Sequence, residues 1–224
     1  MLFAALSAKP NPGSIRDGAL LVALDGALVE QPEEADPFSR LSGAGTVKQQ
    51  RLRDVVRALD AAKGDDHVKA VVLDLDRFTG GYPAAISEVA AAVGKVRAAG
   101  KPVLAYATAY TDDSYALAAN ASEIWVNPLG GAMFAGPGGT RLYYKGLIDK
   151  LGVNAHIYRV GKFKSAVEPY MRSDMPPEAK EADLAMYQQI LDQWRQEIAK
   201  ARPKARIADY LAKPAETVTA AKGD

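Results

Sequence analysis

Short continuous runs of hydrophobic residues recur along the first part of the chain, separated by longer stretches in which apolar and polar residues alternate. The first run, residues 19–25, lies between two glycines, as expected for a strand buried in a sheet. Residues 69–75 and 103–107 repeat this pattern. A shorter run at 124–128 predicts a fourth strand.

The stretches between and after these runs carry apolar residues at helical spacing. Thr46 is placed to cap the first predicted helix, Pro83 suits the first turn of the second, and Gly100 ends it. A long helix is expected after Asp174. The apolar positions that define the predicted helices are Leu52, Val55, Val56 and Leu59; Ile86, Val89, Ala90, Val93 and Val96; residues 115–121; residues 142–151; Met186, Ile190, Leu191, Trp194 and Ile198; and residues 207–211.

Strands that alternate with helices across glycine-marked corners predict an α/β fold with a largely parallel sheet and flanking helices. Residues 78–83 form one such corner, and residues 30–45 and 130–139 are expected to be loops. In such sheets the functional crevice lies at the strand ends. Gly80–Gly81, the cluster at 112–114 and Lys164 each follow a predicted strand, so these three segments are expected to meet there.

A second candidate segment runs from His156 to Pro169. Its first part is predicted to be a strand, and after Gly161 it becomes a polar corner that contains Lys164. Partial burial of a lysine disfavours its charged form and lowers its pKa, which suits a general base. A solvated loop is the alternative interpretation of the same residues.

Composition narrows the function classes. The net charge is +1, which gives no electrostatic case for nucleic acid binding. The chain has no cysteine and two histidines, so disulfides, a thiolate nucleophile and a histidine-rich metal centre are not expected. No apolar run approaches the roughly 20 residues that span a bilayer. Residues 1–17 are interpreted as a linker or the remnant of a membrane anchor, and 18–224 as a domain that is incomplete at its C-terminus.

Tyr158–Pro169, with its Val-Gly-x-x-Lys-Ser-Ala-x-Glu-Pro motif, and the following residues 172–179 resemble the first half of the long form of bacterial signal peptide peptidase, also called protease IV. Residues 71–81, 115–128 and 142–151 fit the same family. The resemblance extends over nearly the whole chain from about Gly18.

The resemblance implies a ClpP/crotonase-like fold and a serine endopeptidase with a Ser-Lys dyad. Two similar halves share one chain in the long form, of which the first supplies the lysine and the second the serine. Carried over to this sequence, the general base is Lys164, which would take the proton from the serine hydroxyl and pass it to the leaving amine.

One position departs from the family pattern. Where short, single-half members have the nucleophilic serine, this sequence has Asp112, and Ser114 lies two positions away. The serine is therefore expected in a missing C-terminal half, and the fragment alone is expected to be inactive. Gly80 and Gly81 match a glycine pair near the family's oxyanion hole. Because the nucleophile is expected elsewhere, a tight strand-to-helix corner is the favoured interpretation of this pair. Ser165 is a candidate for orienting Lys164.

The resemblance also implies the setting of the whole protein. It would be anchored in the bacterial cytoplasmic membrane, with its catalytic domain facing the periplasm or the cell exterior. Its substrates would be hydrophobic cleaved signal peptides, and its partners its own C-terminal half and further copies in a ring-like homo-oligomer. No cofactor and no metal are implied. Two alternatives remain: a non-catalytic scaffold or oligomerisation module, and an acyl-CoA enzyme of the crotonase type.

Overall fold

The computed structural model describes residues 17–33, 48–158, 160–161 and 165–221. The chain divides into two compact units. Unit 1 comprises Met1–Phe134 together with Glu197–Asp224, and unit 2 comprises Ala135–Gln196.

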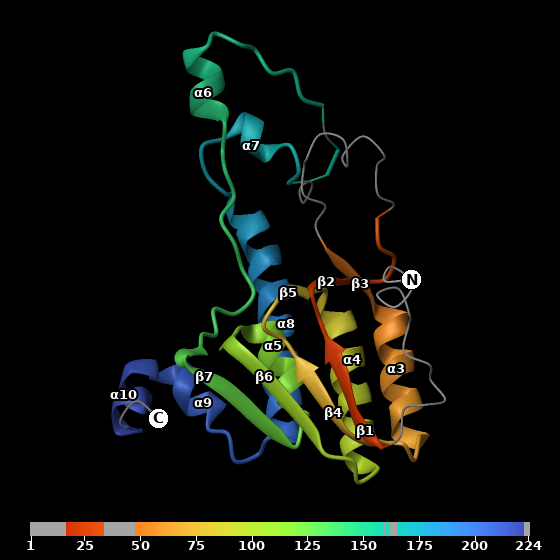
Figure 1. Cartoon of the computed structure of the whole chain (residues 1–224). Helices are drawn as coiled ribbons and strands as arrows, with labels where there is room; N and C mark the ends of the chain where they lie inside the picture. The colour runs from red at the N-terminus through yellow and green to blue at the C-terminus, as the bar shows by residue number, and fades with distance from the viewer. Residues whose placement is uncertain (1–16, 34–47, 159, 162–164, 222–224) are drawn as a thin grey trace. The chain divides into compact units, whose positions relative to one another are not determined.

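A four-stranded, wholly parallel sheet forms the centre of unit 1 (Figure 1). Its strand order is β1-β4-β6-β7. The alternation of α and β elements and the parallel pairing confirm the predicted α/β class. The four strands are β1 (Gly18–Ala23), β4 (Val68–Asp74), β6 (Val103–Tyr110) and β7 (Glu123–Ala132).

Strand β7 is longer than the sequence predicted. Gly131 pairs with Ala109, and the residues expected to begin a loop instead continue the sheet edge. Gly130 is required there, because a Cβ at this position would lie 1.5 Å from the carbonyl oxygen of Thr108.

A second, three-stranded parallel sheet was not predicted. Its order is β3-β2-β5, and its strands are β2 (Gly26–Val29), β3 (Gln49–Arg51) and β5 (Phe78–Gly81). The segment interpreted as a plain glycine corner is thus a short strand that pairs with β2.

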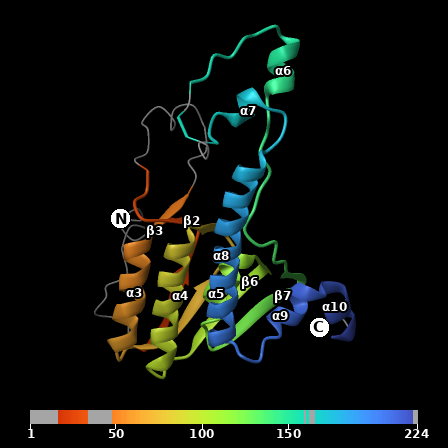
Figure 2. The same cartoon turned by 180° about the vertical axis from the view of Figure 1, so that it is seen from behind.

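Three helices lie on one face of the four-stranded sheet, as Figures 1 and 2 show from opposite sides. They are α3 (Leu52–Gly64), α4 (Pro83–Ala98) and α5 (Asp112–Ala118). The predicted apolar faces of α3 and α4 are confirmed, because Leu59, Val89 and Val93 are completely buried. Burial of each such side chain contributes about 1.5–3 kcal/mol relative to exposure.

The C-terminal part of unit 1 contains α9 (Ile207–Ala212) and α10 (Pro214–Ala220). Tyr210 of α9 meets the ring of Phe134 edge-on, with ring centroids 5.6 Å apart, and Phe134 contacts Tyr115 of α5 at 5.0 Å. Arg202 donates a hydrogen bond to the carbonyl of Ala121 at 2.9 Å. These contacts hold the C-terminal helices against the core.

Unit 2 contains α6 (Lys145–Lys150), α7 (Glu168–Met171) and most of α8 (Pro177–Ala201). The rings of Tyr144 and Tyr170 stack with centroids 5.7 Å apart and join the segments around α6 and α7. The predicted strand at His156–Tyr158 is wrong, because these residues are irregular. A strand needs a hydrogen-bonded neighbour, and within the described residues of unit 2 every regular element is a helix.

The described part of the chain includes no helix that is both long and apolar enough to cross a membrane.

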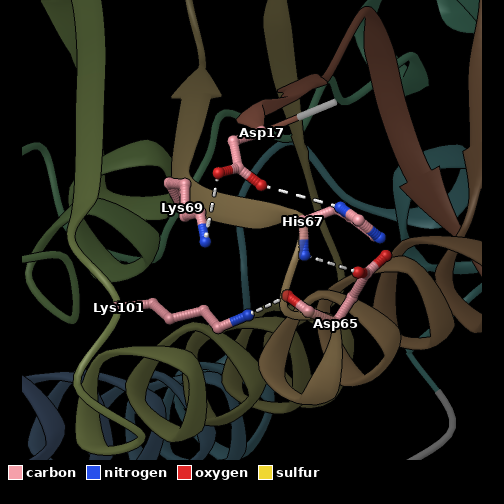
Figure 3. Close-up of polar contacts among 5 residues, drawn as sticks. All are labelled: Asp17, Asp65, His67, Lys69 and Lys101. Atoms are coloured by element: carbon pink, nitrogen blue, oxygen red, sulfur yellow. Dashed lines mark hydrogen bonds and ion pairs between the residues drawn. The ribbon is translucent and has the colours of Figure 1, made fainter. Parts of the chain in front are cut away.

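A polar cluster joins the starts of β1 and β4 to the end of α3 (Figure 3). Asp17 forms ion pairs with His67 at 3.6 Å and with Lys69 at 3.5 Å. The Lys101 ammonium donates to the carbonyl oxygens of Ala62, at 2.6 Å, and Asp65, at 2.5 Å. Lys101 thereby places a positive charge on the last carbonyls of α3, where the helix dipole favours one.

Replacing this lysine tests the cap. We expect Lys101→Met to lower the free energy of unfolding by about 1–2 kcal/mol, because two hydrogen bonds from a charged donor are lost. Urea titration followed by circular dichroism measures the effect. Lys204→Met, at an exposed position of the same unit, is the control for loss of a lysine charge, and an equal effect in both variants would refute the role of Lys101 as a cap.

Candidate active site

The ends of β5 and β6 meet at the place where the sequence predicted a functional crevice. The N–H of Gly81 donates a hydrogen bond to Oδ2 of Asp113 at 3.1 Å. Gly81 ends β5, and Asp113 lies in the first turn of α5, directly after β6. Two of the three predicted site segments are therefore in contact.

The space around both glycines is tight. Gly80 has φ +107°, which favours glycine, and a Cβ there would lie 2.6 Å from Oδ2 of Asp113. A Cβ on Gly81 would lie 3.0 Å from the carbonyl oxygen of Leu28 in β2. Gly80 therefore allows the Asp113 carboxylate to approach the backbone closely, and Gly81 allows β5 to lie close to β2.

The Asp113 carboxyl has a raised pKa. Burial is the largest cause, since it disfavours the charged form, and the neighbouring Asp112 carboxylate adds repulsion. The hydrogen bond from Gly81 opposes both effects by stabilising the anion. This side chain is therefore held in place at an electrostatic cost.

Ser114 is committed to the start of α5. Its Oγ accepts a hydrogen bond from the Thr111 N–H at 2.8 Å, and the two residues form a capping box. The Ser114 side chain is also buried, with 2% of its surface exposed. A hydroxyl in this position cannot reach a peptide carbonyl without breaking the cap, which disfavours Ser114 as a nucleophile.

Two other serines of unit 1 are engaged elsewhere. Ser87 Oγ bonds to both carboxylate oxygens of Glu197, at 2.9 and 3.0 Å. Ser122 Oγ accepts from the N–H of Val103 at 3.1 Å. The corner formed by Gly80, Gly81 and Asp113 thus has an N–H donor and a carboxylate that already occupies it. It lacks a serine nucleophile among the described residues.

The remaining predicted residues belong to unit 2. Lys164 lies outside the described residues, so its role stays a prediction. Ser165 is half-buried, and its carbonyl accepts from the N–H of Glu168 at 3.1 Å. Glu168 begins α7 and has 1% of its surface exposed. The motif therefore includes a buried glutamate four residues after the predicted base. Its acidic side chain and its place in the motif are the sequence signals that mark it.

Hydrogen bonding at the end of β4 adds a further acidic residue that the sequence reasoning did not single out. Oδ1 of Asp76 accepts from the N–H of Thr108 in β6 at 2.7 Å. Hydrogen bonds from Thr108 lower the pKa of Asp76. This contact ties the ends of two neighbouring strands beside the corner.

Within the described residues, no group of three or more histidine, aspartate or glutamate side chains could hold a metal ion.

Comparison with known proteins identifies the relatives of the chain. The profile described as "Peptidase family S49" matches residues 95–222. The protein named Protease 4 of Haemophilus influenzae is 42% identical over 176 residues, which cover 77% of this chain and 29% of that protein. Protease 4 of Salmonella typhi is 40% identical over 172 residues, 74% of this chain and 28% of that protein. The chain thus spans less than a third of the length of these relatives.

Solved structures show weaker likeness. An enoyl-CoA hydratase from Mycobacterium avium subsp. paratuberculosis K-10 aligns with 94% of this chain and 78% of its own at a TM-score of 0.36 and 16% identity. A monofunctional enoyl-CoA isomerase from M. smegmatis aligns over 90% of this chain and 88% of the isomerase chain. The TM-score of that alignment is 0.35 and the sequence identity is 18%. We draw no functional conclusion from similarity at this level.

The raised pKa of Asp113 predicts that the stability of the fold depends on pH. The folded state binds this proton more tightly than the unfolded chain, where the pKa is about 3.9. The contribution of Asp113 to stability is therefore fully present below that value and is lost as the pH rises through the folded pKa. The quantity to follow is the free energy of unfolding of the wild type minus that of the Asp113→Asn variant. We expect this difference to fall as the pH is raised from about 4 to 7.

Urea titrations at several pH values measure this difference. Asp60→Asn, at an exposed position of α3, controls for removal of one carboxylate. A difference that is flat with pH, or that rises, would contradict the burial of Asp113 at the glycine corner.

Proposed function

Because the chain belongs to peptidase family S49, we propose that it is the N-terminal part of a longer serine endopeptidase that degrades cleaved signal peptides. Lys164 is its general base. The nucleophilic serine comes from the part of the polypeptide that this sequence does not contain. The resemblance to signal peptide peptidase is confirmed by the two relatives named Protease 4.

The observation that carries this division of roles is the contact between Asp113 and Gly81. An oxyanion hole works through backbone N–H groups aimed at the negative oxygen of the reacting carbonyl. Here the chain's own carboxylate accepts from such an N–H, and Ser114, the nearest hydroxyl in sequence, caps a helix. Both facts favour a half that cannot complete the reaction alone.

The chemistry assigned to Lys164 follows from the properties of an amine. A neutral ε-amine accepts the serine proton as the hydroxyl attacks the peptide carbonyl, and the resulting ammonium donates that proton to the leaving amine. The lysine must be largely desolvated to be neutral near pH 7. Ser165 is proposed to orient it.

The proposed substrates and setting are supported only by the same family membership. The substrates are extended, hydrophobic peptides, such as signal peptides after their release. The parent protein is anchored in the bacterial cytoplasmic membrane, faces the periplasm or the cell exterior, and forms ring-like oligomers. No cofactor takes part in the proposed reaction.

A non-catalytic scaffold is the second candidate. The occupied Gly81 N–H also suits a half that has lost a reaction centre and serves assembly alone. Lys164 distinguishes the two proposals, because the catalytic role requires its amine and the scaffold role does not.

Peptidase activity on a short, signal-like hydrophobic peptide tests the proposal. We expect the 224-residue chain to be inert and the longer protein to be active. Lys164→Ala in the longer protein is expected to lower kcat by roughly 10³-fold or more, as loss of a general base does. Lys162→Ala, two residues away in the same motif, is the matched control and is expected to leave kcat within about threefold.

Circular dichroism and urea titration must show that the Lys164→Ala protein is folded. Near-normal activity of that variant would leave this chain with the scaffold role. Activity of the 224-residue chain alone would contradict the division of the dyad.

A further inference from the structure

The face of the four-stranded sheet opposite α3, α4 and α5 carries a band of apolar side chains, flanked on the same face by the carboxylates of Asp74 and Glu123. Leu21 of β1 pairs with Val72 of β4, which pairs with Leu104 of β6. One pleat along, Tyr106 of β6 pairs with Trp125 of β7. Because paired residues on parallel strands point to the same side, these five side chains form one band, which we call the open face.

Both edges of the open face are well exposed. Leu21 has 61% of its surface accessible and Trp125 has 58%, while the three residues between them are half-buried. The helix-covered face behaves differently, since Val71, Val103 and Ala105 are completely buried. The same strands therefore carry apolar residues on both sides and bury only one of them within unit 1.

The polar groups of the two aromatic residues are paired with neighbours on β7. The indole N–H of Trp125 donates to Oε2 of Glu123 at 3.0 Å. The Tyr106 hydroxyl accepts from Nδ2 of Asn127 at 3.4 Å. Large aromatic side chains need such partners when they are buried. A partner that covers the apolar band would leave both of these hydrogen bonds in place.

Parallel sheets are almost always covered on both faces. Four strands about 4.8 Å apart, with lengths of 6 to 10 residues at about 3.3 Å per residue, give a face on the order of 500 Å². A stable complex of separate chains buries about 800 Å² on each partner, so this face alone is too small to hold a free second copy. A partner tethered in the same polypeptide needs far less area, because its effective concentration is about millimolar.

We propose that the open face is an intrachain docking surface, covered by an apolar surface from the remainder of the longer polypeptide. The length of the relatives supports this occupant, because this chain covers only 29% and 28% of them. The proposal shares with the proposed function only the premise of a longer polypeptide. It does not depend on Lys164 or on catalysis.

Cysteine labelling tests the proposal directly, since this sequence contains no cysteine. Leu21→Cys places a thiol on the open face, and Glu88→Cys places one at an exposed position of α4. We expect both to react with a maleimide at similar rates in the 224-residue chain. In the longer polypeptide we expect Leu21→Cys to react at least tenfold more slowly and Glu88→Cys to be unchanged, with adducts located by peptide mass spectrometry.

Equal reactivity of Leu21→Cys in the two proteins would overturn the proposal. Protection already present in the 224-residue chain would overturn it too. Protection that increases with protein concentration would then identify a second copy as the occupant, and protection independent of concentration would identify another segment of the same chain.

A second variant guards against a local effect of the new cysteine. Trp125→Glu places a charge on the open face, and we expect it to restore labelling of Leu21→Cys in the longer polypeptide by at least fivefold. The same change is expected to leave the labelling rate in the 224-residue chain unaltered. Because labelling does not report peptidase activity, failure of this proposal is distinguishable from failure of the catalytic one.

Discussion

Packing of α3, α4 and α5 on one face of the parallel sheet is the constraint on which the rest of unit 1 depends. Completely buried residues such as Val71 and Val103 on the strands and Val93 on α4 form that layer. Its closure fixes where β6 ends and α5 begins. Asp113 is thereby carried to the N–H of Gly81. The same one-sided packing leaves Leu21 and Trp125 exposed on the other face.

Local sequence pattern was sufficient for the elements of this layer. The sequence predicted the strands β1, β4 and β6 from their apolar runs and the helices α3 and α4 from their apolar faces. Burial of one face of an element requires apolar residues at regular spacing, and that spacing is visible in the sequence. The short strands β2, β3 and β5 were missed, since three or four residues carry little periodicity and form strands only through distant pairing. The reverse error occurred at His156–Tyr158, where an apolar alternation has no strand to pair with among the described residues of its own unit.

The site was predictable in outline and not in detail. Sequence reasoning placed Gly80–Gly81 and residues 112–114 at the same edge of the sheet, and the structure brings them together. The sequence alone could not show whether Asp112 or Asp113 contacts Gly81. The two side chains are adjacent on α5 and point in directions about 100° apart, and the orientation of the helix decides which of them faces the glycine. The cap that engages Ser114 follows from local spacing, as Thr111 precedes it by three residues. Lys164 lies outside the described residues and stays a prediction.

The central claim is that this chain contributes the base of a catalytic dyad and not its nucleophile. A serine-directed fluorophosphonate applied to the longer polypeptide, with the adduct mapped by peptide mass spectrometry, tests the claim most directly. We predict one labelled serine outside residues 1–224, with labelling strongly reduced in Lys164→Ala. An adduct on Ser114, or on any other serine of this chain, would contradict the claim.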